Sequence, residues 1–496
     1  MQQDQVSKSL RLGLKAILAS KIKMLTGFLL IAASVQAQPI IPKQAPEEPS
    51  DKKEDVLRKG QMASLAWPPQ LANGKEVATD RSPEFLVQPE HVKLEEGIEI
   101  AKTPPTIDFL YFSGQTHPGR LWSVWGDGFA IGSKYYTSIG DHDSPRGEAQ
   151  VYEYDSRTKK LRLIMNVKKF LEQPGMLPPD IDYIPGKIHS RTEMGSDGWI
   201  YFSTHRGSIS DNTTDARGYK GDNIYRVNPK TGKMEIAAFY PMPKHTIPAS
   251  VLDPDRLIYY GGTAQGNDAV DKGSWFIAYD VKNHKLLMKA EGGFDRYAIF
   301  SRSNGCVYWR GLSKAKEGGT DAGAYGRKYD PKTNTIVACP QVPVVRACTE
   351  ETKDGIVYGF TQGDRNIWAF DVRNETIKTI GPGMVASQDY VTSVDLDPVT
   401  QRYIYYVPGA HGGGVADGIP VVQYDIKTNT RKIIAFLSKF YTENYGYSPD
   451  GTFSTAVSPD GSILFITWNG SRFPNAKDWD TVAMTAIHIP ESERLP

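Results

Sequence analysis

The fold is decided by two consecutive stretches, DGWIYFSTHRG at residues 197–207 and IYRVNPKTGKMEI at residues 224–236. In the first, an Asp-Gly turn leads into a strand rich in aromatic and β-branched residues. In the second, two alternating strands flank a turn of Asn, Pro, Lys and Gly, which is the pattern of a β-hairpin. The pair recurs as DGIVYGFTQGD at 354–364 and IWAFDVRNETIKTI at 367–380. A unit that repeats in this way predicts one supersecondary structure used many times.

The number of copies predicts an all-β fold, a seven-bladed β-propeller. The first stretch has seven copies, which begin at residues 127, 197, 255, 304, 354, 401 and 460. The hairpin copies lie roughly 40 to 70 residues apart, which suits blades of four strands. We expect residues 480–490 to supply outer strands of the last blade, and a segment near 107–125 to close the ring. Two β-sandwiches are the competing fold, and the repeat argues against them.

Composition and charge exclude several classes of protein. The 496 residues include 46 Gly, 33 Pro and 26 Tyr, which suits many short strands joined by tight turns. Lys and Arg number 58 and Asp and Glu number 57, so the formal net charge is +1. No overall field would therefore attract nucleic acid or an anionic membrane, and any anion site must be local. The three cysteines form no CxxC motif and are expected to be free and buried.

The N-terminus has the pattern of an export signal. Basic residues within 1–23 precede an apolar run of about a dozen residues, and the small residues Val35 and Ala37 predict cleavage after Ala37. The run is too short to span a bilayer comfortably, so no membrane span is expected in the mature protein. A buried N-terminal helix is the alternative. We predict a signal peptide at 1–37, a flexible leader at 38–104 and the propeller at 105–496, in a secreted or periplasmic monomer.

Histidines gather where a propeller builds its binding sites. The loops after the second strand of each blade lie on one face, around the channel, and three of the nine histidines fall on them: His142, His205 and His411. The connections that lead into the blades emerge on the same face and carry His189 and His245. We predict that His142, His189 and His205 are catalytic. The predicted substrate-binding residues are Arg191, Arg206, Arg310, Tyr297, Tyr390 and His411.

A site of His, Arg and Tyr suits proton abstraction beside an anionic group. In β-elimination from a uronate, a cation neutralises the carboxylate, a base takes the C5 proton and an acid protonates the leaving oxygen. A glycosidase would need two carboxylates, for which Asp141, Asp143 and Asp389 are candidates. Converging histidines could also hold zinc or manganese.

Two segments resemble a known family. GDH at 140–142 and GKIHSRTEMGSDGWIYFSTHRG at 186–207 resemble the secreted propeller ulvan lyases of polysaccharide lyase families 24 and 25. ATDRSPEFL at 78–86 resembles strings in a wider group of secreted bacterial proteins. The resemblance implies cleavage of a sulfated rhamnose–uronate polymer by a His/Tyr acid–base pair, with a neutralising Arg and a structural zinc.

The family's site residues carry over in part. The resemblance matches His142 to the family's His in the first blade and Arg206 to its neutralising Arg. His189 stands where the family has its catalytic Tyr. His245 and Cys306 are the candidate ligands of the implied zinc. Substitutes for the missing Tyr are Tyr201, Tyr297 and Tyr390.

Three functions follow from these patterns. The first is a secreted lyase whose partner is an anionic, uronate-containing polysaccharide. The second is a propeller that binds a glycan or a protein without catalysis. The third is another propeller hydrolase, such as a glycosidase or a metal-dependent lactonase.

Overall fold

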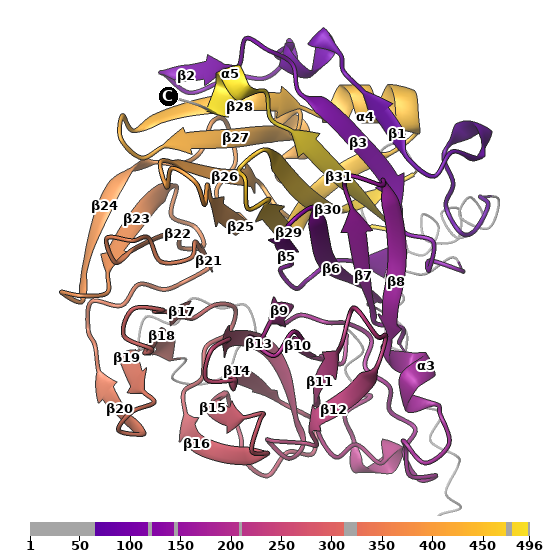
Figure 1. The fold of residues 1–496 in the computed structure, drawn as a ribbon, viewed down its shortest axis with the longest axis vertical. Helices are drawn as coiled ribbons and strands as arrows, with labels where there is room; N and C mark the ends of the chain where they lie inside the picture. The colour runs from indigo at the N-terminus through magenta and orange to yellow at the C-terminus, as the bar shows by residue number, and fades with distance from the viewer. Residues whose placement is uncertain are drawn as a thin grey trace, which may run out of the picture. The chain divides into compact units, whose positions relative to one another are not determined.

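The computed structural model describes residues 65–117, 122–142, 147–207, 211–311, 325–472 and 479–494. The chain divides into two compact units, 1–61 and 62–496, and every described residue belongs to the second. The predicted signal peptide at 1–37 lies outside the described residues. In the second unit the strands form seven sheets around a central axis, so the fold is a seven-bladed β-propeller (Figure 1).

Each blade is an antiparallel sheet whose strands follow one another from the centre outwards (Figure 1). Blade 1 contains β4 (Trp122–Ser123), β6 (Lys134–Asp141), β7 (Gln150–Asp155) and β8 (Lys160–Asn166), with β5 (Phe129–Ile131) paired to β6. Blade 2 contains β9 (Glu193–Met194), β10 (Ile200–Ser203), β11 (Ile224–Val227) and β12 (Met234–Ala238). Blade 3 contains β13 (His245–Asp253), β14 (Ile258–Gln265), β15 (Trp275–Asp280) and β16 (Lys285–Glu291).

The remaining blades repeat this arrangement. Blade 4 contains β17 (Ile299–Phe300), β18 (Val307–Gly311), β19 (Tyr325–Asp330) and β20 (Thr335–Ala338). Blade 5 contains β21 (Ala347–Cys348), β22 (Ile356–Phe360), β23 (Asn366–Asp371) and β24 (Thr376–Pro382). Blade 6 contains β25 (Val391–Leu396), β26 (Tyr403–Pro408), β27 (Pro420–Asp425) and β28 (Thr430–Phe436). Blade 7 contains β29 (Ser448–Val457), β30 (Ile463–Ser471), β31 (Thr481–His488) and β3 (Thr106–Tyr111).

The ring closes as the sequence predicts. β3, from the start of the described chain, pairs antiparallel with β31 from its end, and this completes blade 7. Joining the first and last strands in one sheet removes the exposed edges that an open ring would leave.

The predicted boundary at residue 105 is too late, because part of the expected flexible leader belongs to the propeller. β1 (Ala78–Asp80) pairs with β3, and β2 (Ile98–Ile100) pairs in parallel with β28. Between them Phe85 is fully buried, with its ring centre 4.5 Å from that of Phe440 on α4 (Ser438–Tyr445). The Pro-rich, charged composition of this segment hid the few apolar residues that anchor it.

The Tyr-Asp turns have a local cause. Five carboxylates each accept the backbone N–H of the residue two positions later, which closes an Asx turn at the blade edge; they are Asp155, Asp280, Asp330, Asp371 and Asp425. The residue four positions after each Asp has a φ between 52° and 58°. These aspartates therefore have a structural role in the turns.

Aromatic packing between neighbouring blades supplies much of the core. The rings of Phe276 in blade 3 and Trp309 in blade 4 stack at 4.2 Å, and those of Tyr135 in blade 1 and Phe465 in blade 7 at 5.1 Å. All three cysteines are free and buried, as predicted.

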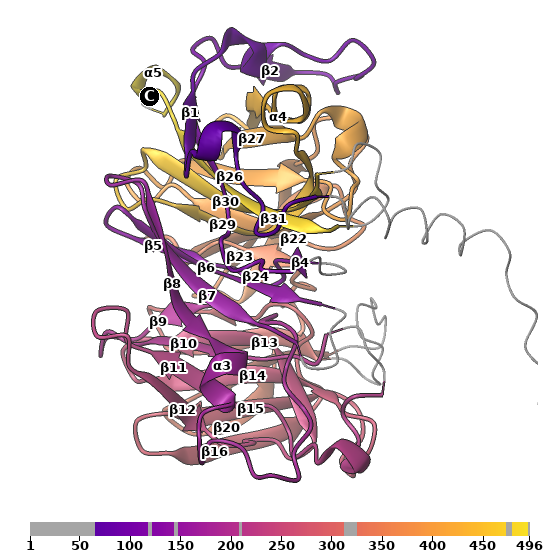
Figure 2. The ribbon, with the colours of Figure 1, turned by 90° about the vertical axis from the view of Figure 1, so that its right-hand side faces the viewer.

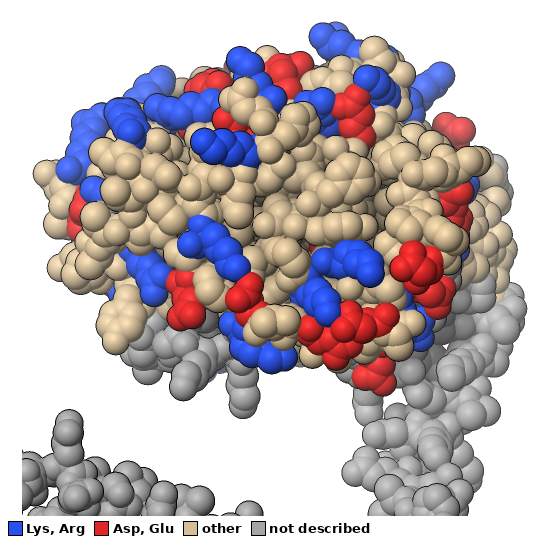
Figure 3. All heavy atoms as spheres, turned by 90° about the horizontal axis from the view of Figure 1, so that it is seen from below, with Lys and Arg blue, Asp and Glu red and all other residues tan. Residues whose placement is uncertain are grey.

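In the described residues the α-helices are short and lie outside the sheets (Figures 1 and 2). Besides α4 they are α3 (Val167–Leu171) and α5 (Glu491–Arg494). No helix in the described part of the chain is long and apolar enough to cross a membrane. Figure 3 shows basic and acidic side chains interspersed on the face that it displays, in keeping with the balanced charge.

Candidate functional site

The loops that follow the second strands and the connections that lead into the blades meet at one end of the channel. We call the group of side chains gathered there the histidine site; it consists of Trp125, His142, Lys187, His189, His205, Arg296, Arg346, Tyr390, His411 and Phe453. The three residues predicted to be catalytic are all among them. The structure therefore brings together residues that lie far apart in the sequence.

Trp125 lies at the centre of the histidine site, between β4 and β5. Its ring stacks on His142 at 4.9 Å with an interplanar angle of 19°, and lies nearly parallel to His189 at 5.8 Å. Lys187 places its ammonium group 4.4 Å from the centre of the indole ring. The indole N–H donates to Ser123 Oγ at 2.6 Å, which fixes the orientation of the ring. Trp125 thus orders the groups around it.

His189 is neutral at neutral pH. Its Nδ1 lies 2.9 Å from the Pro248 carbonyl oxygen, which can only accept, so Nδ1 carries the proton. Nε2 is then an acceptor, and Arg296 Nη1 lies 2.6 Å from it and 2.8 Å from Nδ1, so the guanidinium contacts the ring beside both nitrogens. Burial holds the pKa of His189 well below its usual 6.5, and the nearby charges of Arg296 and Lys187 lower this pKa further. His189 therefore presents a neutral basic nitrogen beside a guanidinium group.

His205 is positioned by the backbone. His205 and Lys187 exchange two backbone hydrogen bonds, of 2.9 and 3.2 Å, which join a loop after β10 to the connection before β9. Nδ1 of His205 accepts the Gly207 N–H at 3.2 Å, so neutral His205 carries its proton on Nε2. Its ring centre is 5.5 Å from that of His189. Two neighbouring imidazoles thus hold their protons on different nitrogens, one as a base and the other as a donor.

Tyr390 and His411 extend the histidine site across blade 6. The Tyr390 hydroxyl is hydrogen-bonded to His411 Nδ1, and the Arg346 guanidinium lies 5.6 Å from the centre of the Tyr390 ring. Partial burial of its ring, together with the charges of Arg346 and Arg296, lowers the pKa of His411 to about 4, while part of its surface stays exposed. Burial also raises the pKa of Tyr390 to about 12. Both side chains are therefore uncharged at neutral pH.

A buried carboxyl group beneath Trp125 separates the histidine site from the other end of the channel. Asp127 accepts hydrogen bonds from Tyr297 Oη at 2.7 Å and Ser393 Oγ at 2.8 Å, and from the Thr455 backbone N–H at 3.2 Å. These partners come from blades 4, 6 and 7, and burial raises the pKa of Asp127. We call Asp127 and these three partners the Asp127 crossbar. Tyr297 was predicted to bind substrate, but its hydroxyl donates to the buried Asp127 carboxylate.

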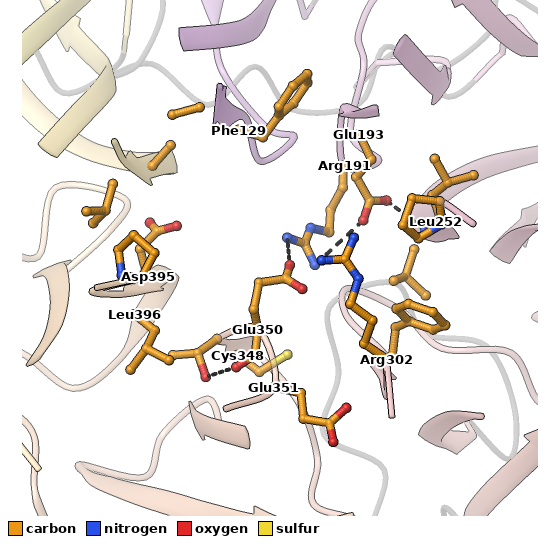
Figure 4. A pocket seen from close by; sticks show the side chains of 18 of the residues that line it. Phe129, Arg191, Glu193, Leu252, Arg302, Cys348, Glu350, Glu351, Asp395 and Leu396 are labelled. Atoms are coloured by element: carbon orange, nitrogen blue, oxygen red, sulfur yellow. Dashed lines mark hydrogen bonds and ion pairs between the residues drawn. The ribbon is translucent and has the colours of Figure 1, made fainter. Parts of the chain in front are cut away.

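The opposite end of the channel holds a cavity of about 500 Å³, which we call the lower cavity (Figure 4). Arg191 lines it, 3.2 Å from Glu350 and 3.9 Å from Glu193, so the structure separates this predicted substrate-binding residue from the histidines. Burial raises the pKa values of Glu193 and Asp395 to about 7. This end is thus acidic, whereas the histidine site is basic.

The other predicted binding residues have mixed positions. Arg206 directly follows His205, and its charge acts on the buried Asp222, whose pKa burial raises to about 7. Arg310 instead donates to the carbonyl oxygens of Val342, at 2.7 and 3.0 Å, and Pro340, at 2.9 Å. Arg310 therefore secures the connection that follows blade 4.

The structure does not join the two candidate zinc ligands. The ring nitrogens of His245 are already engaged by Thr263 Oγ1 at 2.9 Å and the Asp271 carbonyl oxygen at 2.7 Å. Cys306 packs in the apolar core between blades 4 and 5. Among the described residues, no group of three or more His, Cys, Asp or Glu could hold a metal ion. These donors do not fit the implied zinc.

The alternative acids are no better placed for a glycosidase. Asp141 is engaged by His117 Nε2 at 2.9 Å, and Asp389 is exposed. Asp143 lies outside the described residues.

Sequence reasoning missed several members of the histidine site. Trp125, Lys187 and Phe453 were not singled out, and Arg296 and Arg346 were not assigned a role. Their shared signal is position, because each lies on or near a connection that leads into a blade. Arg296 and Lys187 lie close to His189, whereas the predicted binding residues Arg191 and Arg310 contact Glu350 and the Val342 carbonyl oxygen.

Comparisons with known proteins give similar solved structures but no matching sequence family. No protein-family model matches the chain, and no curated protein matches it. Similar solved structures include an oligogalacturonate lyase from Vibrio parahaemolyticus, with 11% identity and a TM-score of 0.49 over 85% of this chain and 99% of that one. An oligogalacturonate lyase in complex with manganese has 12% identity and a TM-score of 0.46, over 84% and 98%. The β-propeller domain of the Trilobed protease from Pyrococcus furiosus has 10% identity and a TM-score of 0.40, over 76% and 98%. Likeness at this level carries no argument about activity.

Proposed function

We propose that the chain is a lyase that cleaves a uronate-containing polysaccharide by β-elimination at the histidine site. The observation that carries the proposal is the neutral His189 with its basic Nε2 2.6 Å from the Arg296 guanidinium. Proton abstraction next to a carboxylate requires this combination, because a cation must neutralise the carboxylate before the C5 proton becomes acidic enough to remove.

The substrate carboxylate would also activate the base. Arg296 can pair with a carboxylate through its fork of N–H groups, and Lys187 adds a second positive charge nearby. A carboxylate that draws Arg296 towards itself releases Nε2 of His189 from its hydrogen bond. The added negative charge raises the pKa of His189 from its low value, which makes the ring a stronger base when substrate is bound.

The elimination then uses groups of this chain and water. Nε2 of His189 takes the C5 proton, the C4–C5 double bond forms as the C4–O bond breaks, and the leaving oxygen takes a proton from water. His205 is the group that we favour for stabilising that oxygen, because its neutral ring presents an Nε2–H that can hydrogen-bond to the developing negative charge. His142, whose ring stacks on Trp125 at 4.9 Å, is the second candidate. No step uses a metal ion.

The test is incubation of the chain without residues 1–37 with a panel of polyuronates, including ulvan, pectic polymers and glucuronan. We expect unsaturated products that absorb in the ultraviolet, and their loss in His189→Ala. His91→Ala is the matched control, because His91 is exposed and bonds only to the Ala416 carbonyl oxygen. A folded protein that gives no unsaturated product from any uronate would refute the proposal.

The same panel separates the alternatives. New reducing ends without ultraviolet absorbance indicate a hydrolase, and retention on a uronate column without cleavage indicates a binding protein. We further propose that the enzyme acts outside the cytoplasm as a monomer, which fractionation of cells and gel filtration of the mature chain test.

A further inference from the structure

We propose that Trp479 and His411 form a stacking subsite for a neutral pyranose ring, next to the position of the uronate. The inference rests on the proposed function and narrows its substrate to a polymer in which a neutral sugar adjoins the uronate. The subsite needs no charged group, because the aromatic rings would bind the sugar by stacking against the face of its ring.

The two rings form an aromatic wall at the rim of the histidine site. The Trp479 ring centre is 5.2 Å from that of Trp125 and 5.5 Å from that of His411. The ring planes of Trp479 and His411 differ by 25°. His411 is exposed and Trp479 is half-buried, whereas Phe453 behind them is 2% exposed. Both rings therefore offer surface to a ligand while the residues behind them hold them in place.

The chemistry of the wall suits a sugar rather than an ion. A pyranose ring presents a face of C–H groups, and Trp combines a large apolar ring with one N–H donor for a hydroxyl group. Among the described residues the Trp479 indole N–H has no hydrogen-bond partner. The low pKa of His411 keeps its ring uncharged, so it can act as an aromatic surface. The neighbouring Asp480 carboxylate is directed to Ser471 Oγ at 2.7 Å.

The wall adjoins the cationic part of the site. The Arg296 guanidinium lies 4.7 Å from the Phe453 ring centre, the Phe453 ring 4.7 Å from Trp125, and Trp125 5.2 Å from Trp479. The rings of Phe453 and Trp125 therefore lie between Arg296 and Trp479. A polysaccharide whose carboxylate binds Arg296 would reach Trp479 with its next sugar. That spacing assigns the stacking surface to a neighbouring sugar and not to the uronate itself.

The test compares Trp479→Ala and Trp479→Phe with Trp275→Phe in the His189→Ala background, which prevents turnover. Trp275 is a matched control because it is also half-buried, but it lies on blade 3 under Lys289. We measure binding of a homopolymeric uronate oligosaccharide, an alternating uronate–neutral oligosaccharide and a neutral oligosaccharide alone, by calorimetry and tryptophan fluorescence. Trp479→Ala should weaken binding of the alternating oligosaccharide about tenfold. Trp479→Phe should restore most of it, and the uronate homopolymer should bind the same in all variants.

The outcomes separate the two proposals. If Trp479→Ala binds the alternating oligosaccharide as tightly as its parent, the stacking subsite is refuted while the lyase proposal stands. If the neutral oligosaccharide quenches fluorescence in the parent and not in Trp479→Phe, the subsite is supported even when no uronate is cleaved. If none of the three oligosaccharides binds the parent, both proposals fail.

Discussion

Glu193 in the lower cavity should make the protein less stable as the pH rises. Its side chain is 15% exposed, and burial raises its pKa from 4.5 to about 7 despite Arg191 at 3.9 Å. A carboxyl group whose pKa is raised by folding does not affect the free energy of unfolding below its unfolded pKa. As the pH rises through its folded pKa, the group ionises and lowers the free energy of unfolding. The full cost above pH 7 is roughly 3 kcal/mol, of which about 2 kcal/mol develops between pH 5 and 8.

Glu193→Gln removes this cost while leaving an acceptor for the Leu252 N–H, which Glu193 now binds at 2.9 Å. We expect the unfolding free energy of the variant relative to wild type to rise by about 2 kcal/mol from pH 5 to pH 8, measured by denaturant titration. Fixed effects of the substitution cancel in this difference between pH values. Glu350→Gln is the control, because Glu350 contacts the same Arg191 but is 67% exposed. A flat difference for Glu193→Gln, or one that falls with pH, would refute the reasoning.

Three further outcomes follow from the structure. Arg296→Gln should raise KM for a uronate substrate about 10- to 100-fold in steady-state assays, whereas Arg310→Gln should change it less than about twofold. Nuclear magnetic resonance should show the His189 ring neutral down to pH values well below 6.5, and titration near 6.5 would contradict the site as described. Gly262→Ala should destabilise the fold by about 3 kcal/mol or more, because its Cβ would lie 1.9 Å from a backbone oxygen. Gly381→Ala, whose Cβ would meet only a tyrosine hydroxyl at 3.1 Å, should lower the free energy of unfolding much less. Thermal unfolding of the two variants and the wild type measures the difference.

The repeat predicted the fold because each blade encodes its own turns and strands locally. The Asp371 turn, for example, is specified within four residues, by an Asx hydrogen bond and a left-handed residue at Glu375. The leader could not be predicted in the same way. β1 and β2 are three residues each, and their stability comes from blades 7 and 6 rather than from their own sequence.

The sequence predicted which histidines gather at the site, but it did not predict which arginines point towards them. Position in the repeat was enough to aim His142, His189 and His205 at one end of the channel. It could not separate Arg191 from Arg296, because both lie near the start of an innermost strand. A shift of a few residues along that strand moves a side chain past the Asp127 crossbar, from the basic end of the channel to the acidic one.

The contrast between the two ends shows how a protein of nearly zero net charge could bind the polyanion that we propose as its substrate. Lys187, Arg296 and Arg346 lie at the histidine site, while Glu193 and Asp395 line the lower cavity, on the far side of Asp127. Field lines from the cations of the histidine site are focused in a low-dielectric channel mouth. A uronate would thus be attracted to the end of the channel that holds the proposed base, whereas the lower cavity, which Arg191 and Arg302 line, pairs Arg191 with carboxyl groups (Figure 4). A balanced composition and a polyanionic substrate are then compatible. The protein needs no excess of positive charge, because the cations of the histidine site and the carboxyl groups of the lower cavity lie at different ends of the channel.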